Sequence, residues 1–457
     1  MSTTRRGFIT GCSAAVAAYA GTSFNTLAFG DPGYNEEILV TLFLRGGIDG
    51  LNMVMPIAGA DRGHYVSARP NIGVPTSGSN AALALDSQLG VHPAAGTGPS
   101  GAPSTFFNLY QDGKVVFVPA CGMHEDNRSH FDSMNFMELG TPGTLSTGTG
   151  WLTRHLQSAR NLPGEIIMPA LAAGNLQQNS LRGSIEAINM SDPDSFSLEV
   201  GPWEWRSAQR VALRHLYNGT SWLHQSGIET LDAVDIIELN GGSGGYTPGN
   251  GAVYPGGNLA EHLQTVARMI KLDLGLRIAT VDFGGWDTHN GQGDDGGGYF
   301  YGHAEELLSA LAAFYTDLDG SGGSNYTQRL TVVVMSEFGR RLRENDDRGT
   351  DHGHGSFVLV MSGNALGGVK GTWPGLANHQ LFDGADLAVT TDYRRVLSEI
   401  LIRRLQNTNL GVVFPGYTDY TPLGVVSGPD LPPVYEPPIF ESGFESGDKS
   451  DWSSAIP

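Results

Sequence analysis

Short apolar runs recur along the chain, and each is followed by glycine or polar residues. Runs of this length, with little polar alternation, are typical of strands that are buried on both faces of a parallel sheet. We therefore expect central strands at residues 38–44, 115–118, 169–173, 277–281, 330–335 and 357–361.

Helical patterns separate these runs. In the segment 259–274, for example, Leu263, Val266 and Ile270 fall on one face of a helix, and Asn258 is positioned to cap it. An order in which strands alternate with helices predicts an α/β fold with a large, mostly parallel sheet and helices on both faces. The other expected helices are 106–110, 131–139, 151–159, 204–217, 229–239, 301–318 and 393–405.

One α/β domain is expected to span residues 36–425. Within it, residues 70–104 are rich in glycine, alanine, serine and proline, which predicts a long surface excursion that could serve as a lid. The stretch 191–239 carries two helical patterns without a chemical cluster, and this suits a cap. Residues 426–457 begin as a proline-rich linker and end in a short acidic appendage.

The first 28 residues have the features of an export signal. Arg5 and Arg6 precede Phe8 and a mildly apolar, alanine-rich segment, which resembles a twin-arginine signal peptide. An ordinary secretory signal or a disordered basic start is the alternative. The pattern predicts the twin-arginine translocase as a partner and a periplasmic or secreted location.

Composition narrows the functional classes. The formal net charge of −20 counts against nucleic-acid binding and against anionic membrane surfaces. After residue 28 no run approaches the roughly 18 apolar residues of a spanning helix, so no stable membrane anchor is expected. Cys12 belongs to the expected signal, which leaves Cys121 without an internal disulfide partner. The basic residues Arg340, Arg341 and Arg343 either lie on the solvated surface or bind one anionic group.

Acidic and imidazole side chains follow several of the expected strands. Asp49 comes after 38–44 in a glycine-rich turn, and Asp287 and His289 come after 277–281. In extended chain, residues two apart point to the same side, so Asp287 and His289 can reach one ion. Ligands bind outside the carboxyl ends of strands in open α/β sheets, which makes these residues candidate metal ligands. For Asp49, a turn aspartate that holds its own loop is the alternative.

The densest group is the stretch from Glu337 to His354, which also contains Asp351 and His352 and follows the expected strand 330–335. Carboxylates together with imidazoles suit Zn²⁺, Mn²⁺ or a similar divalent ion and are too rich in nitrogen for a dedicated Ca²⁺ site. The candidates outnumber the ligands that one ion needs, so two ions about 4 Å apart are expected. Some of these residues could instead hold loops or orient the ligands.

A third group lies between residues 121 and 132. Ser129 would stand at the start of the helix 131–139, where exposed amide groups favour an anion. It is therefore a candidate nucleophile for phosphoryl transfer, and a simple helix cap is the alternative. His124 and His130 could be ligands or could orient them, although a lone histidine is more often structural.

With these residues assembled, the chain resembles the bacterial family called domain of unknown function 1501. That family is grouped with the alkaline phosphatase and sulfatase superfamily, so the resemblance implies an alkaline phosphatase-like α/β fold with a two-metal hydrolytic centre. The likeness runs from about residue 38 to residue 405. It rests on the twin-arginine start and on the motifs Leu44–Gly50, Arg128–Phe131, Gly285–His289, Ser336–Arg340 and Asp351–Gly353.

The resemblance also assigns positions, with two departures from the superfamily. Around Cys121 the chain lacks the motif that forms formylglycine, which argues against a sulfatase of that kind, and the Asp287-x-His289 spacing is tighter than the Asp-x-x-x-His of alkaline phosphatases. On that pattern Ser129 would take the nucleophile position and Asp49 would be a first-strand ligand. The remaining metal positions would fall to Asp287, His289, Asp351, His352 and His354.

The sequence therefore predicts an exported, metal-dependent hydrolase of phosphate or related ester bonds, whose substrate is a small-molecule or polymer ester. The alternative is a non-catalytic exported protein that binds or assembles at the cell surface and keeps a degenerate metal site. The glycine-rich loops and the acidic appendage motivate this alternative. The expected catalytic residue is Ser129, and the expected metal ligands are Asp49, Asp287, His289, Glu337, Asp351, His352 and His354.

Overall fold

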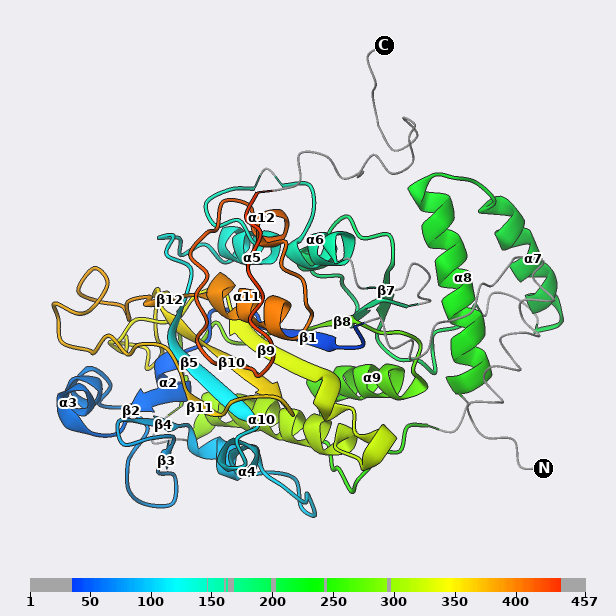
Figure 1. Ribbon diagram of the computed structural model, residues 1–457. Helices are drawn as coiled ribbons and strands as arrows, with labels where there is room; N and C mark the ends of the chain where they lie inside the picture. Colours follow the sequence, from blue (N-terminus) through cyan, green and yellow to red (C-terminus); the bar gives the residue numbers. More distant parts are fainter. Residues whose placement is uncertain are drawn as a thin grey trace, which may run out of the picture.

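A nine-stranded sheet with helices on both faces organises the protein in a computed structural model (Figure 1). The structure describes residues 35–145, 147–159, 162, 168–198, 203–241, 245–293 and 297–436. The expected signal peptide at 1–28 and the acidic appendage after residue 436 lie outside this part. Across the sheet the order is β11 (Gly368–Val369), β5 (Val115–Gly122), β10 (Ser356–Ser362), β9 (Leu330–Ser336), β1 (Ile38–Leu44), β8 (Ile278–Phe283), β6 (Ala170–Ala173) and β7 (Ala187–Met190), and β12 (Thr391–Asp392) also pairs with β5.

The sheet is mixed. β10 runs antiparallel to both of its neighbours, β5 and β9, whereas the other pairings that the structure describes within this sheet are parallel. The reversal has a local cause, because the loop 337–355 between β9 and β10 contains no helix that could carry the chain back to the opposite end. This loop is the stretch in which the sequence concentrates its acidic and imidazole side chains.

The two faces of β1 build two separate cores. Val40 and Leu42 point into one hydrophobic cluster, and Leu39 and Phe43 point into the other, as the alternation of side chains along a strand requires. The first cluster is covered by α4 (Phe106–Gln111), α9 (Asn258–Leu272) and α10 (Gly298–Leu318), and the second by α5 (His130–Leu139), α6 (Trp151–Ser158), α11 (Tyr393–Arg403) and α12 (Leu410–Val413).

The helix α9 starts differently from the expectation. Asn258 was expected to cap the helix from outside, but it is the first helical residue, and Gly257 is the N-cap with a φ of 114°. A side chain at Gly257 would also collide with Glu306 of α10. Glycine therefore takes the cap position because a φ of 114° strains any residue that carries a Cβ.

The segment 70–104 is only partly a surface excursion. It contributes β3 (Leu83–Ala84) and β4 (Leu89–Val91), which form a second sheet with β2 (Val54–Pro56) in the order β2-β4-β3. Leu89 and Val91 are buried in the first hydrophobic cluster. The short elements α2 (Gly50–Met53), α3 (Gly59–Ala68) and the 3₁₀ helix η1 (Pro93–Gly96) complete this region.

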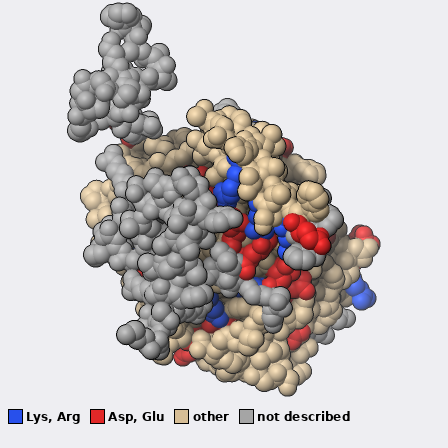
Figure 2. Space-filling view, turned by 90° about the vertical axis from the view of Figure 1, so that its right-hand side faces the viewer, with Lys and Arg blue, Asp and Glu red and all other residues tan. Residues whose placement is uncertain are grey.

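A helical hairpin stands at one side of the molecule, at the right of Figure 1. It consists of α7 (Arg206–Leu216), none of whose residues is buried, and α8 (Trp222–Gly241). Arg214 of α7 pairs with Asp235 of α8 at 2.8 Å, and Arg210 contacts the same carboxylate. Acidic and basic side chains gather on the face that lies on this side (Figure 2). Ion pairs therefore attach the exposed helix α7 to α8, whereas α8 itself buries Ala233 and Ile237 in the first hydrophobic cluster.

The remaining short helices are η2 (Asn179–Leu181), η3 (Trp203–Trp205), η4 (Gly322–Ser324) and η5 (Thr327–Arg329). None of the helices in the described ranges is long and apolar enough to cross a bilayer.

The pH dependence of stability should reflect His155, which is buried in α6 next to Asn407. Burial lowers the pKa of His155 to about 4. In the unfolded chain the histidine takes up a proton near pH 6.5, whereas in the folded protein it stays neutral down to about pH 4. The unfolding free energy is therefore highest above pH 6.5 and falls by about 3 kcal/mol as the pH falls towards 4. We expect His155→Gln to lose less unfolding free energy than the wild type between pH 7 and pH 4 in urea titrations. Parallel pH profiles of the two proteins would contradict this role.

Candidate metal centre

The carboxyl ends of three parallel strands meet at one edge of the sheet. Leu44 of β1 lies beside Phe283 of β8 and Ser336 of β9. The loops that follow these strands are therefore brought together, although they are far apart in the sequence. Such an edge is where α/β sheets commonly bind ligands.

A buried guanidinium ties the three loops together. Arg340 donates hydrogen bonds to the carbonyl oxygens of Gly46 and Gly47 after β1, with 2.6 Å to Gly47, and to Thr350 at 2.9 Å. Its Nη2 atom also donates to Oδ1 of Asp287 after β8, at 2.5 Å. From the sequence, this arginine could either bind an anion or lie in solvent. In the structure it is buried, and its hydrogen-bond acceptors are carbonyl and carboxylate groups of the protein itself.

The loop after β1 needs glycine at two consecutive positions. Gly46 has a φ of 117°, and a Cβ there would lie 2.5 Å from the backbone nitrogen of Asp287. A Cβ on Gly47 would lie 2.4 Å from the ring of Phe338. The two glycines therefore permit the close backbone approach on which the site depends.

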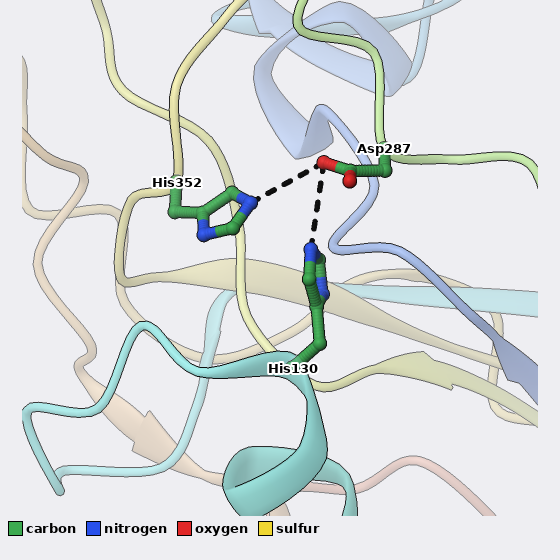
Figure 3. A group of neighbouring side chains, drawn as sticks. All are labelled: His130, Asp287 and His352. Carbon is green, nitrogen blue, oxygen red and sulfur yellow. Dashed lines mark hydrogen bonds and ion pairs between the residues drawn. The ribbon is translucent and has the colours of Figure 1, made fainter.

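Three imidazoles converge on one carboxylate oxygen. Oδ1 of Asp287 lies 3.0 Å from Nε2 of His289, 3.2 Å from Nε2 of His352 and 3.4 Å from Nε2 of His130. The Nε2 atoms of His289 and His352 are 2.9 Å apart. Figure 3 shows His130 and His352 approaching Asp287 from different segments, α5 and the loop before β10.

The opposite nitrogen of each ring faces an acceptor. Nδ1 of His130 lies 2.7 Å from Glu337, and Nδ1 of His352 lies 2.9 Å from the carbonyl oxygen of Arg128. Nδ1 of His289 lies 3.3 Å from Asp351. A proton on Nδ1 of each ring would satisfy these acceptors and would leave the Nε2 lone pair available to a cation.

Electrostatics keep Asp287 ionised. Its partial burial alone would raise the pKa, but the hydrogen bond and charge of Arg340 outweigh burial and lower the pKa of Asp287 to about 2. The hydrogen bond to Glu337 raises the pKa of His130 against the effect of burial. Burial lowers the pKa of His352 and so favours its neutral form.

Within the described ranges, His130, Asp287 and His352 form a group whose potential ligand atoms all lie within 4.8 Å of one another. His289 adjoins this group through both Asp287 and His352. Imidazole nitrogen with one carboxylate oxygen is a donor set that suits Zn²⁺ or a similar transition metal.

Of the other expected ligands, two lie around this group and support it. Glu337 is buried and accepts hydrogen bonds from Gly46 at 2.9 Å and Ser336 at 2.9 Å as well as contacting His130. Asp351 is half exposed, and the Asn345 amide lowers its pKa. Both therefore occupy the positions of carboxylates that orient histidines rather than reach the centre themselves.

The structure does not bring Asp49 or His354 to the group. Oδ2 of Asp49 accepts hydrogen bonds from Arg69 at 2.5 Å and Gln292 at 2.6 Å, and both ionic side chains are fully buried. His354 stacks on Phe382 with ring centroids 4.0 Å apart, and burial lowers its pKa to about 4. The arginine partner of Asp49 comes from the end of α3, a contact that no spacing in the sequence indicates.

Ser129 is the N-cap of α5 and is exposed. Its hydroxyl accepts a hydrogen bond from the backbone of Asp132 at 3.4 Å, as in a helix cap, and Ser129 directly precedes His130 in the chain. His130 itself was only a secondary candidate in the sequence. Its position directly after Ser129 in the motif Arg128–Phe131 was the available signal.

Residues 261–412 match the model of a family described as protein of unknown function (DUF1501). This match supports the resemblance to that family. The matched segment includes Asp287, His289 and His352, whereas His130 lies upstream of it. No curated protein matches the chain.

Removing the guanidinium of Arg340 should destabilise the fold strongly. Arg340→Met leaves Asp287 and several carbonyl groups without their donor, which we expect to cost about 4 kcal/mol of unfolding free energy. The matched control is Arg343→Met, an exposed arginine three residues away, whose cost should stay within about 0.5 kcal/mol. Urea unfolding measures both values, and equal effects would contradict the role given to Arg340.

Proposed function

We propose that the protein is an exported, metal-dependent hydrolase of phosphate or related ester bonds, with an alkaline phosphatase-like arrangement of its α/β fold. The observation that carries the proposal is the convergence of three Nε2 atoms on Oδ1 of Asp287. The Nε2 atoms of His289 and His352 also lie only 2.9 Å apart, close enough to share one ligand. A cation could accept lone pairs from these nitrogens and balance the charge of Asp287.

The residues present fit a divalent ion. His130, His352 and Asp287 offer two imidazole nitrogens and one carboxylate oxygen, the proportions of a catalytic zinc site that keeps its fourth position open. Nε2 of His130 is buried and has no hydrogen-bond partner, as expected of a ligand atom. A bound ion would supply Lewis-acid catalysis at a phosphoryl oxygen. The geometry favours one ion rather than the expected pair, because Asp49 and His354 are engaged elsewhere.

The chain's own residues would prepare the site. Glu337 fixes the ring of His130, Asp351 fixes that of His289, and Arg340 holds Asp287 in its ionised form. Ser129 is exposed beside His130, at the start of a ten-residue helix whose amide groups favour an anion. In the proposed reaction its Oγ displaces the alcohol from phosphorus, the hydroxyl proton leaves with the alcohol, and water then hydrolyses the phosphoserine.

A second candidate is a non-catalytic exported binding or cell-surface assembly protein with a degenerate site. A specific observation favours it: two of the expected carboxylate ligands, Asp49 and Asp287, have arginine partners in the structure. Buried arginines reduce the charge available to a cation. On this proposal the ion, if bound, would stabilise the loops rather than take part in a reaction.

Metal content separates a working centre from an accidental cluster. We expect the purified protein to bind Zn²⁺ or Mn²⁺ in titration calorimetry, and Asp287→Ala or His352→Ala to abolish this binding. Glu337→Gln, which weakens the hold on His130, should lower the affinity by about 10- to 100-fold. The control is His64→Gln at an exposed histidine, which should bind as the wild type does. Metal binding that survives both ligand substitutions would refute the centre.

Turnover separates the two candidate functions. We expect metal-loaded protein to hydrolyse an aryl phosphate, and Ser129→Ala and Asp287→Asn each to lower kcat/KM by at least about 100-fold. Ser104→Ala provides a matched serine control away from α5. If the loaded protein binds metal but turns over no phosphate or sulfate ester, and instead binds cell-envelope polymer stoichiometrically, the binding function is the correct one.

A further inference from the structure

A cavity of about 250 Å³ lies between the small sheet and the edge of the large one. The segment 83–91 supplies Asp86, Gln88 and Leu89, and α3 supplies Asp61. Trp373 closes it from the segment after β11. None of these residues takes part in the proposed metal centre.

The walls of this cavity combine one indole with two carboxylates. Nε1 of Trp373 donates to Oδ2 of Asp61 at 2.8 Å, and the backbone of Leu376 donates to Oδ1 at 2.9 Å, so Asp61 fixes the indole in place. Oδ1 of Asp86 accepts hydrogen bonds from the backbones of Gln88 and Leu89, each at 2.7 Å. The indole of Trp373 and the carboxylate of Asp61 are thus held in place without a ligand.

The cavity lining carries negative charge without a basic counterpart. Among the described residues, neither Asp61 nor Asp86 forms an ion pair, and no lysine, arginine or histidine lines the cavity. Lys370 lies between Val369 and Gly371 in the sequence but is not one of the lining residues. Arg62 donates instead to the carbonyl oxygens of Pro56 and Val74.

We propose that this cavity binds a small organic cation, such as an alkylated ammonium group. A tryptophan face attracts a cation through its quadrupole, and it does so more strongly where the cation is desolvated. The apolar walls formed by Pro56, Leu89 and Pro119 accommodate alkyl groups, and the carboxylates balance the charge. An anionic ligand would meet two negative charges and no positive one.

Titration calorimetry with choline and with its uncharged carbon isostere, 3,3-dimethylbutan-1-ol, tests the proposal. Choline should bind, and the isostere should bind at least about tenfold more weakly. Asp86→Asn changes an exposed side chain and should weaken choline binding about tenfold, as should Trp373→Leu. Asp112→Asn, at an exposed carboxylate on α4's end, should leave choline binding unchanged.

Three results would overturn the proposal. They are equal affinity for choline and the isostere, absence of choline binding at millimolar concentration, and choline binding that Asp86→Asn and Asp112→Asn weaken equally. Binding of a neutral sugar in place of choline would identify the cavity as a polyol site instead. Because Trp373 also packs against the hydrophobic core, the decision rests on Asp86→Asn if Trp373→Leu does not fold.

Discussion

The guanidinium of Arg340 is the interaction on which the functional edge of the sheet depends. Burying a cation is costly unless all its donors are paired. Here carbonyl oxygens from the loops after β1, β8 and β9, together with the carboxylate of Asp287, supply that pairing. One side chain thereby fixes three loops that are joined by no continuous secondary structure. The glycines at 46 and 47 are the condition for this arrangement, since any Cβ there would push the loops apart.

Two aspartates illustrate how the environment divides similar residues between structure and chemistry. Asp49 and Asp287 both follow a parallel strand, and both pair with an arginine. Asp49 is fully buried against Arg69, whereas the side chain of Asp287 is 49% exposed and faces imidazole nitrogens. The first therefore holds the backbone between β1 and α3, and the second remains accessible to a ligand. This difference underlies the proposal of one metal centre in place of two.

The segment 70–104 and the loop after β11 make a second, separate contribution. Together with Pro56, Ala58, Asp61 and Pro119, their residues line a cavity with its own charge and its own aromatic group. Only part of its lining, including Trp373, falls within residues 261–412, the segment that matches the family model. The cavity thus combines a portion of the chain that the family match covers with one that it does not.

The sequence by itself determined the elements and the loops that carry the chemistry. Continuous apolar runs located β1, β5, β8, β9 and β10 within a few residues, because burial on both faces imposes a pattern that no other local structure needs. The alternation with helices gave the α/β class, and the strand-end positions gave Asp287, His289 and His352 as candidates. The tertiary structure alone decided that β10 runs antiparallel and that His130 belongs to the candidate metal centre. It also decided that Asp49 pairs with Arg69 and that His354 stacks on Phe382. Each of these depends on a partner far away in the chain, and such pairings leave no periodicity or spacing that a single sequence can reveal.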